Sequence, residues 1–447
     1  MTAKKKFRFS RRELISLLFT VLIAFAPSGT RYILKTGSIL GHAVEPGTVS
    51  VFGMQLVAIA FAALVFATYG MKGLIEALQR PAGVSAACVA VFALLSSFQA
   101  QDALAGLTSA SFVATGVAVF FAIVIFRPDP REVLTGFVGG AVFQVGLGGW
   151  QFFTQSAFAS KWLGMAMHSA DQLGAFVIET ETGRWLRAYG SLSHPNVFGL
   201  YVGLGLLMCI GLAAYRGHGR HTRFYALMPI ITAGLLFSFS RSAILAVAAG
   251  VIWMVVSAFG SEAAPDYRRV LVPSFIIISV TVAALSLFYR DPLITRATAS
   301  GRLEAQSISQ RGSQFSDAAA LWANHPFTGV GIGQMPLALA RESATERNWW
   351  QYDYVHNVPA LVAVETGLIG LIVWLGFVVT TLMIVRDRLV HETSVSSGVT
   401  VYAAAFIAML MAAMFDHFLW SSWFGQLLFW AVAGLLHAAY INLRKAR

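Results

Sequence analysis

The sequence predicts an all-α polytopic membrane protein, a bundle of about twelve transmembrane helices with one large loop of short helices. Hydrophobic residues make up 57% of its 447 positions and charged residues only 12%, a balance that water-soluble domains of this length do not show. Several apolar runs also exceed the roughly 18 residues that a helix needs to cross a bilayer. Residues 1–447 are therefore expected to form a single membrane domain.

Charged or turn-rich breaks between the apolar runs define the expected helices. These begin near residues 13, 49, 82, 111, 132, 194, 223, 242, 270, 357, 396 and 420. The even number places both termini on the same side of the membrane. The basic N-terminus also resembles a signal peptide, with a small-residue pattern at residues 24–26, but we interpret the first run as an uncleaved span.

Lysines and arginines follow the positive-inside rule if both termini are cytoplasmic. Of the 32 basic residues, 20 then fall on the cytoplasmic side, and every short loop agrees with the rule. Nine of the other 12 lie in two long outer loops, 153–193 and 289–355, where orientation does not depend on charge. The loop at 289–355 is also long for a connector, so we expect a function for it.

The remaining composition excludes several classes of protein. The formal charge of +11 is scattered between apolar runs, so it indicates no nucleic-acid partner. Cys88 and Cys209 lie inside apolar runs without CxxC spacing, which argues against a disulfide framework. The outer loops carry no acidic cluster with metal-ligand spacing, so we expect neither a metal nor a cofactor.

The loop at 289–355 should contain short helices. Residues 314–324 are amphipathic, and His325-Pro326 would end that helix and begin a glycine-rich turn through residues 328–333. Among the six arginines of the loop, Arg311 is the preferred ligand, because it begins the amphipathic segment that would hold it in place. Several of the others are expected to be solvated charges.

The sequence around His194 marks the outer end of a predicted span. Arg187 precedes Ser193-His194-Pro195-Asn196, in which Pro195 suits an early helical position and Ser193 a cap. This is either only a helix start or, together with the arginine, a site for an anionic group.

Arg241 lies between two serines in a very short break between apolar runs. Its guanidinium either snorkels to the lipid headgroups or faces a polar cavity that holds a phosphate. The flanking serines favour the cavity.

His356 stands at the mouth of another predicted span, beside Tyr354 and Asn357. A neutral imidazole there takes up a proton near neutral pH, so the group is either catalytic or structural. Glu365 lies roughly two and a half turns deeper and is expected to pair with a buried partner. At the last outer turn, Asp416 is expected to pair with an arginine, and the nearby tryptophans, Trp420 and Trp423, to form an interfacial belt.

Four motifs in this order resemble the O-antigen ligase and polymerase superfamily of bacterial membrane glycosyltransferases. The resemblance is strongest at residues 185–375. It rests on Arg187 with Ser-Leu-Ser-His194-Pro-Asn196, on Ser240-Arg241-Ser242, on His325-Pro326 with Gly329-Val-Gly331-Ile-Gly333, and on His356-Asn357 with Glu365-Thr-Gly367-Leu-Ile-Gly370.

This resemblance implies a metal-independent, inverting transfer of a glycan from undecaprenyl pyrophosphate. Arg187, Arg241 and Arg311 would bind the pyrophosphate, and His356 would act at the acceptor. Substrate contacts would come from Asn357, Tyr354, His194, Asn196 and Glu365. The expected setting is lipopolysaccharide biosynthesis at the periplasmic face of the inner membrane, among membrane lipids.

The alternative activities within this superfamily differ in the acceptor of the glycan. A ligase uses a lipid A-core sugar, a polymerase uses another lipid-linked glycan, and a protein O-oligosaccharyltransferase uses a protein hydroxyl, all with the same donor. We favour the ligase. A lipid or polysaccharide transporter or flippase is the alternative of another class, but the sequence lacks inverted hydropathy repeats.

Overall fold

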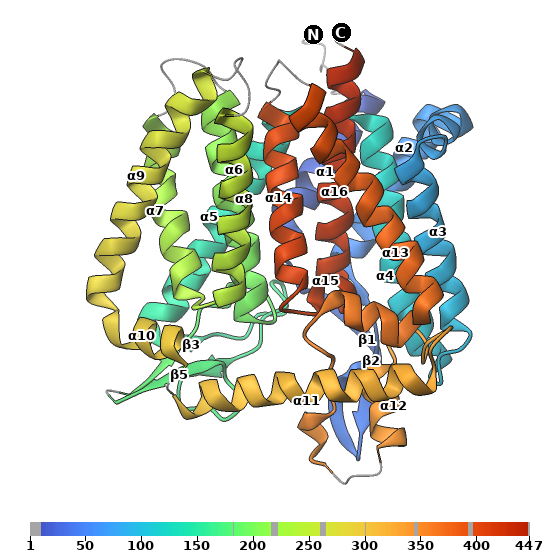
Figure 1. The fold of residues 1–447 in the computed structure, drawn as a ribbon, viewed down its shortest axis with the longest axis vertical. Coiled ribbons are helices and arrows are strands. Elements are labelled where there is room, and N and C mark those ends of the chain that lie inside the picture. Colours follow the sequence, from blue (N-terminus) through green and yellow to red (C-terminus); the bar gives the residue numbers. More distant parts are fainter. Residues whose placement is uncertain are drawn as a thin grey trace, which may run out of the picture.

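The computed structural model describes residues 10–181, 183–215, 222–259, 265–299, 301–343, 347–391 and 397–445. Each of the twelve predicted helices corresponds to a helix of this structure (Figure 1). They are α1 (Arg11–Phe25), α2 (Gly53–Leu78), α3 (Pro81–Ser97), α4 (Ala103–Phe126), α5 (Pro130–Thr154), α6 (Pro195–Tyr215), α7 (Thr222–Phe237), α8 (Arg241–Phe259), α9 (Pro265–Phe288), α13 (Val358–His391), α14 (Ser397–Ala413) and α16 (Trp423–Lys445). The basic residues 1–9 and the loop 216–221, which entered the charge count, lie outside the described residues.

Within the described residues, eight of these helices are long and apolar enough to cross a membrane, and α3, α7 and α14 are shorter apolar helices. The all-α polytopic class is therefore confirmed, whereas the number of twelve spans stays a prediction.

Two helices, α6 and α16, form the centre of the bundle. Their apolar stretches are 94% and 89% buried, whereas that of α9, at one edge, is only 17% buried (Figure 1). Glycines let neighbours approach α6 closely. A Cβ atom on Gly203 would lie 2.4 Å from a methyl group of Val247 in α8, and one on Gly211 would lie 2.2 Å from a methyl group of Val401 in α14. Such close approach through small residues is a common way to pack helices in a membrane.

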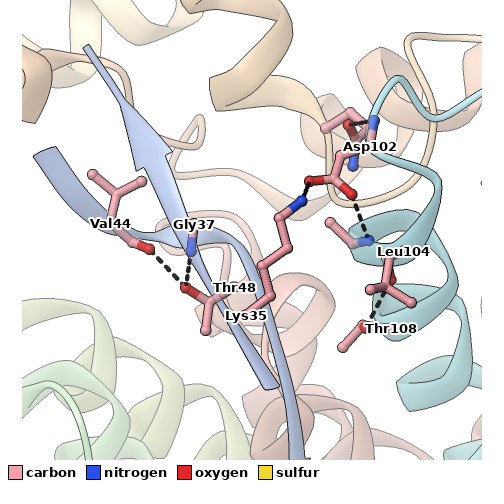
Figure 2. Close-up of polar contacts among 9 residues, drawn as sticks. Lys35, Gly37, Val44, Thr48, Asp102, Leu104 and Thr108 are labelled. Atoms are coloured by element: carbon pink, nitrogen blue, oxygen red, sulfur yellow. Dashed lines mark hydrogen bonds and ion pairs between the residues drawn. The ribbon is translucent and has the colours of Figure 1, made fainter. Parts of the chain in front are cut away.

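A β-hairpin that the sequence analysis missed separates α1 from α2. It consists of β1 (Arg31–Ile39) and β2 (His42–Phe52), so the second helix begins at Gly53 and not near residue 49. Its turn residues, Leu40 and Gly41, both have positive φ, as a type I′ turn requires. Figure 2 shows how Lys35 of β1 reaches Asp102, the N-cap of α4, at 2.5 Å. This ion pair joins the hairpin to the bundle.

Four very short strands form two further two-stranded sheets between α5 and α6. They are β3 (Ser156–Ala157), β4 (His168–Ser169), β5 (Val177–Thr180) and β6 (Gly183–Leu186).

The large loop contains the predicted short helices. They are α10 (Arg290–Thr298), α11 (Arg302–Asn324), α12 (Met335–Glu342) and the 3-10 helix η1 (Trp349–Gln351). The predicted helix at 314–324 ends at Asn324 as expected, but it begins already at Arg302, because its first turns also bury a face that includes Glu304. Figure 1 shows α11 lying across one end of the bundle, opposite the end at which α16 finishes. We call the end covered by α11 the loop end.

The glycine turn after α11 fastens the loop to α13. Its glycines at 329, 331 and 333 have φ of 71°, 99° and 72°, a region that favours glycine. The amide of Gly331 donates to the carbonyl of Glu365 at 2.9 Å. Close by, α13 is broken at Gly367, where φ is 66° and ψ is −172°. The loop and the broken helix therefore hold each other in position.

Candidate functional site

Polar side chains from six segments gather at the loop end. These segments are the link from β6 to α6, the turn between α7 and α8, the helices α10 and α11, the start of α13, and the link from α14 to α15 (Phe418–Ser421) (Figure 1). They carry the four residues predicted to be catalytic, which are Arg187, Arg241, Arg311 and His356. The fold therefore brings residues that are distant in sequence to one end of the bundle.

Arg187 is buried, and its guanidinium is held on two sides. Its Nε donates to the carbonyl oxygen of Ser238 at 2.8 Å, and its Nη2 donates to Oδ1 of Asn196 at 2.7 Å. Burial, together with the charges of Arg296 and Arg311, lowers the pKa of Arg187 to about 9. The group is still protonated at neutral pH. Arg187 thus fixes the start of α6 against the α7–α8 turn while keeping its charge.

His194 occupies the start of α6. Its Nδ1 accepts a hydrogen bond from the backbone amide of Asn196 at 2.9 Å, a contact that the sequence analysis had assigned to Ser193. Burial lowers the pKa of His194 well below its usual value. Because Nδ1 accepts, the imidazole is neutral and its proton lies on Nε2.

Asp416 receives hydrogen bonds from two amides. Nδ2 of Asn196 donates to Oδ2, and the backbone amide of His417 donates to Oδ1, each at 2.8 Å. Among the described residues no arginine forms an ion pair with Asp416, so the predicted arginine partner was wrong; amide groups take its oxygens. Burial raises the pKa of Asp416, but the attraction of His356, His417 and His194 in their protonated forms, together with the hydrogen bond from Asn196, outweighs burial and holds that pKa below its usual range. Asp416 is therefore an anion at neutral pH.

His356 lies just before α13, with Nδ1 2.8 Å from Oε1 of Gln314 in α11. An amide oxygen only accepts, so this contact places the proton on Nδ1 and leaves the lone pair of Nε2 free. Burial lowers the pKa of His356 below its usual value, and the charge of Asp416 partly opposes this effect. The ring meets His417 edge-on, with centroids 5.0 Å apart. His356 is thus a neutral imidazole that can accept a proton at Nε2.

Arg311 stands one turn before Gln314 on α11, so the two side chains share a face of the helix. Burial and the charge of Arg241 lower the pKa of Arg311, whereas Asp416 raises it. Four other arginines of the loop form ion pairs, which are Arg296 with Glu304, Arg302 with Glu179, Arg341 with Glu342, and Arg347 with Asp317.

No described carboxylate forms an ion pair with Arg187, Arg241 or Arg311. Arg311 interacts electrostatically with both Arg187 and Arg241, and three guanidinium groups without a described ion-pair partner create a region that favours an anion. The sequence analysis predicted this role for all three arginines, and it stays a prediction.

Arg296 and Glu304 support this region and were missed by the sequence analysis. Nε of Arg296 donates to the carbonyl oxygen of Phe239 at 3.0 Å, and its other end pairs with the buried carboxylate of Glu304. Arg241 in turn donates to the carbonyl oxygen of Arg296 at 3.4 Å. The three contacts connect α10 and α11 to the α7–α8 turn. The burial of Glu304 in the structure reveals these contacts. The amino-acid sequence gives no sign that this glutamate is buried.

Asn357 and Tyr354, which were predicted to contact substrate, make contacts within the protein. The amide of Asn357 donates to the carbonyl oxygen of Met414 at 3.1 Å. The hydroxyl of Tyr354 lies 3.5 Å from the carbonyl oxygen of Gly333, and its ring packs on His417. Their role toward substrate stays a prediction.

Glu365 has the buried partner that was expected. Its Oε2 accepts a hydrogen bond from Nε1 of Trp420 at 2.9 Å. Trp420 is 6% exposed and Trp423 2%, so both belong to the protein core and not to the predicted interfacial belt. A buried carboxylate requires donors, which explains an indole at this position.

Three residues of the site offer ligand atoms to a divalent cation. One ring nitrogen of His356, one of His417 and a carboxylate oxygen of Asp353 lie within 4.8 Å of one another. The sequence analysis expected no metal and did not consider Asp353 as a ligand, because this cluster forms only when the segments before α13 and before α15 come together.

Comparison with known proteins covers three of the four residues predicted to be catalytic. Residues 226–375 match the family model described as O-Antigen ligase. The matched segment includes Arg241, Arg311 and His356, whereas Arg187 and Asp416 lie outside it. No curated protein matches the chain.

Proposed function

We propose that this chain, a member of the O-antigen ligase superfamily of membrane glycosyltransferases, is an O-antigen ligase. It transfers a glycan from undecaprenyl pyrophosphate to a sugar hydroxyl of the lipid A-core, at the periplasmic face of the bacterial inner membrane. The observation that carries the proposal is the set of arginines without ion-pair partners among the described residues, which are Arg187, Arg241 and Arg311, beside a neutral His356.

The arginines hold the pyrophosphate of the donor. Guanidinium groups bind phosphate oxygens through charge-assisted hydrogen bonds, which strengthen as charge develops on a leaving group. Arg187 is already oriented by Asn196 and Ser238, so it needs little reorganisation when substrate arrives. These groups supply the positive charge for which other phosphate sites use a divalent ion, and the reaction needs none.

His356 acts on the acceptor. Its Nε2 takes the proton of the sugar hydroxyl while that oxygen attacks the anomeric carbon of the donor. The bond from the anomeric carbon to the pyrophosphate oxygen breaks, and its electron pair leaves with the pyrophosphate. A single displacement inverts the configuration at the anomeric carbon.

The test is glycan transfer by the purified chain in liposomes that contain lipid-linked glycan and lipid A-core. His356→Gln is expected to lower the rate by about 10²- to 10⁴-fold, the usual contribution of a general base. His325→Gln is the matched control, because this histidine of the same loop is 38% exposed and pairs at 3.2 Å with Glu342. Equal rates for wild type and His356→Gln would refute the proposal.

The product identifies the acceptor. Glycan on lipid A-core supports the ligase. A lengthened glycan on the undecaprenyl carrier would assign a polymerase instead, and glycan on a protein hydroxyl would assign a protein transferase. Passage of the intact donor between leaflets without transfer would assign a flippase.

A further inference from the structure

We propose that Asp353, His356 and His417 form a binding site for one zinc-type divalent ion, and that its occupation inhibits glycan transfer. The inhibition rests on the proposed function, because it requires His356 to be the base. The binding of the ion does not depend on that function.

The ligand types and their spacing suit such an ion. Two imidazole nitrogens and one carboxylate oxygen lie within 4.8 Å of one another. Zinc binds these atoms at about 2.0–2.2 Å, so the side chains must close by on the order of 1 Å to meet one ion. Three protein ligands leave a fourth tetrahedral position for water. Two imidazoles also favour zinc over magnesium, which prefers oxygen ligands.

Each ligand is held from behind by a second group. Nδ1 of His356 lies 2.8 Å from Oε1 of Gln314, and Nδ1 of His417 lies 2.7 Å from Oγ of Ser421. In both rings the nitrogen left for a metal is Nε2. Histidine ligands in proteins commonly have such an outer partner, which orients the ring. Asp353 is likewise held in place, since its Oδ1 accepts a hydrogen bond from the backbone amide of Tyr354 at 2.7 Å.

The charges near the cluster also favour a cation. The carboxyl groups of Asp353 and Asp416 both interact with His356, and in their ionised forms they balance a charge of two. Asp416 precedes His417 in the chain, and its Oδ1 accepts a hydrogen bond from the backbone amide of His417 at 2.8 Å. The positive charge of Arg311, on α11, acts against a cation at this cluster.

Inhibition follows because the metal ion and the acceptor proton would use the same lone pair, that of Nε2 of His356. An ion bound to Nε2 of His356 occupies the electron pair that would accept the proton of the acceptor hydroxyl. The metal-loaded protein therefore lacks a free base at this position, and removal of the metal restores it.

Binding is tested on the full chain in detergent micelles with Zn²⁺ alone, in competition with a chromophoric chelator. We expect one equivalent to bind, and Co²⁺ to give the absorption of a tetrahedral site. His417→Gln and Asp353→Asn should each weaken binding by more than about 100-fold, since they remove ligands and not only outer partners. His325→Gln should bind like wild type. Absence of binding to wild type, or unchanged binding in both ligand variants, would overturn the site.

Inhibition is tested by transfer with and without Zn²⁺, each variant being compared with its own metal-free rate. Saturating Zn²⁺ should slow wild type at least about tenfold, reversibly with EDTA, and should not slow His417→Gln. Zinc binding with undiminished transfer would overturn the inhibitory role. Full metal-free transfer by His356→Gln would instead refute the proposed function, while leaving the binding result intact.

Discussion

The imidazole of His356 and the side-chain amide of Gln314 share a hydrogen bond of 2.8 Å that joins the start of α13 to α11. The two residues are 42 positions apart, one before a membrane-spanning helix and the other in the large loop. Since the amide oxygen accepts, the bond selects the tautomer in which Nε2 can take a proton. Gln314 is thus a positioning residue for His356.

Replacement of Gln314 should alter both the rate and its pH dependence. Gln314→Leu removes a hydrogen bond worth about 1–1.5 kcal/mol, so glycan transfer should fall by about tenfold. Gln314→Glu keeps an acceptor for Nδ1 and adds a charge that favours the imidazolium, so the pKa of His356 should rise and the acid limb of the pH–rate profile should move to higher pH. A purely structural Gln314 would leave the profile of Gln314→Glu unmoved.

Removal of an unpaired arginine should harm transfer more than removal of a paired one. Arg311→Gln is expected to lower the rate by about 10²- to 10³-fold, the range for the loss of one donor to a developing charge. Arg302→Gln on the same helix is the control, because that side chain is 73% exposed and pairs with Glu179. Similar losses in the two variants would contradict an anion site at Arg311.

The acid limb of transfer should depend on Asp416. A general base must be unprotonated, and burial lowers the pKa of His356, so activity should persist below pH 6.5 and be lost only at more acidic pH. The charge of Asp416 raises that pKa. Asp416→Asn removes the charge while keeping an acceptor for Asn196, so the acid limb should move to lower pH. The measurement is kcat/KM against pH, and a shift to higher pH would be inconsistent with this coupling.

Trp420 should matter for stability through Glu365. Trp420→Phe removes the indole donor 2.9 Å from a buried carboxylate, which should cost about 1–3 kcal/mol of unfolding free energy. Thermal unfolding in detergent measures the loss. Trp162→Phe is the control, because Trp162 is 88% exposed. Equal melting temperatures for the two variants would show that the hydrogen bond contributes nothing.

The sequence by itself determined the helices of the bundle, and it predicted the residues of the proposed anion site. Hydropathy identifies a membrane helix because the hydrocarbon core demands a long apolar run, whatever its neighbours are. The hairpin at residues 31–52 escaped this reasoning, because it consists of two paired strands with a turn at Leu40–Gly41 and contains no long apolar helix.

Only the tertiary structure decided how the polar residues are used. The sequence shows six arginines in the large loop, and it favours Arg311 only through its place at the start of the amphipathic segment, without showing which arginines form ion pairs. The fold neutralises Arg302 with Glu179 and Arg347 with Asp317, while Arg311 forms no ion pair with a described carboxylate. The fold likewise decides that Asp416 accepts hydrogen bonds from amides and that His356 forms a hydrogen bond with Gln314. Pairing depends on distances of a few ångströms between segments remote in sequence, and only the packed bundle sets those distances.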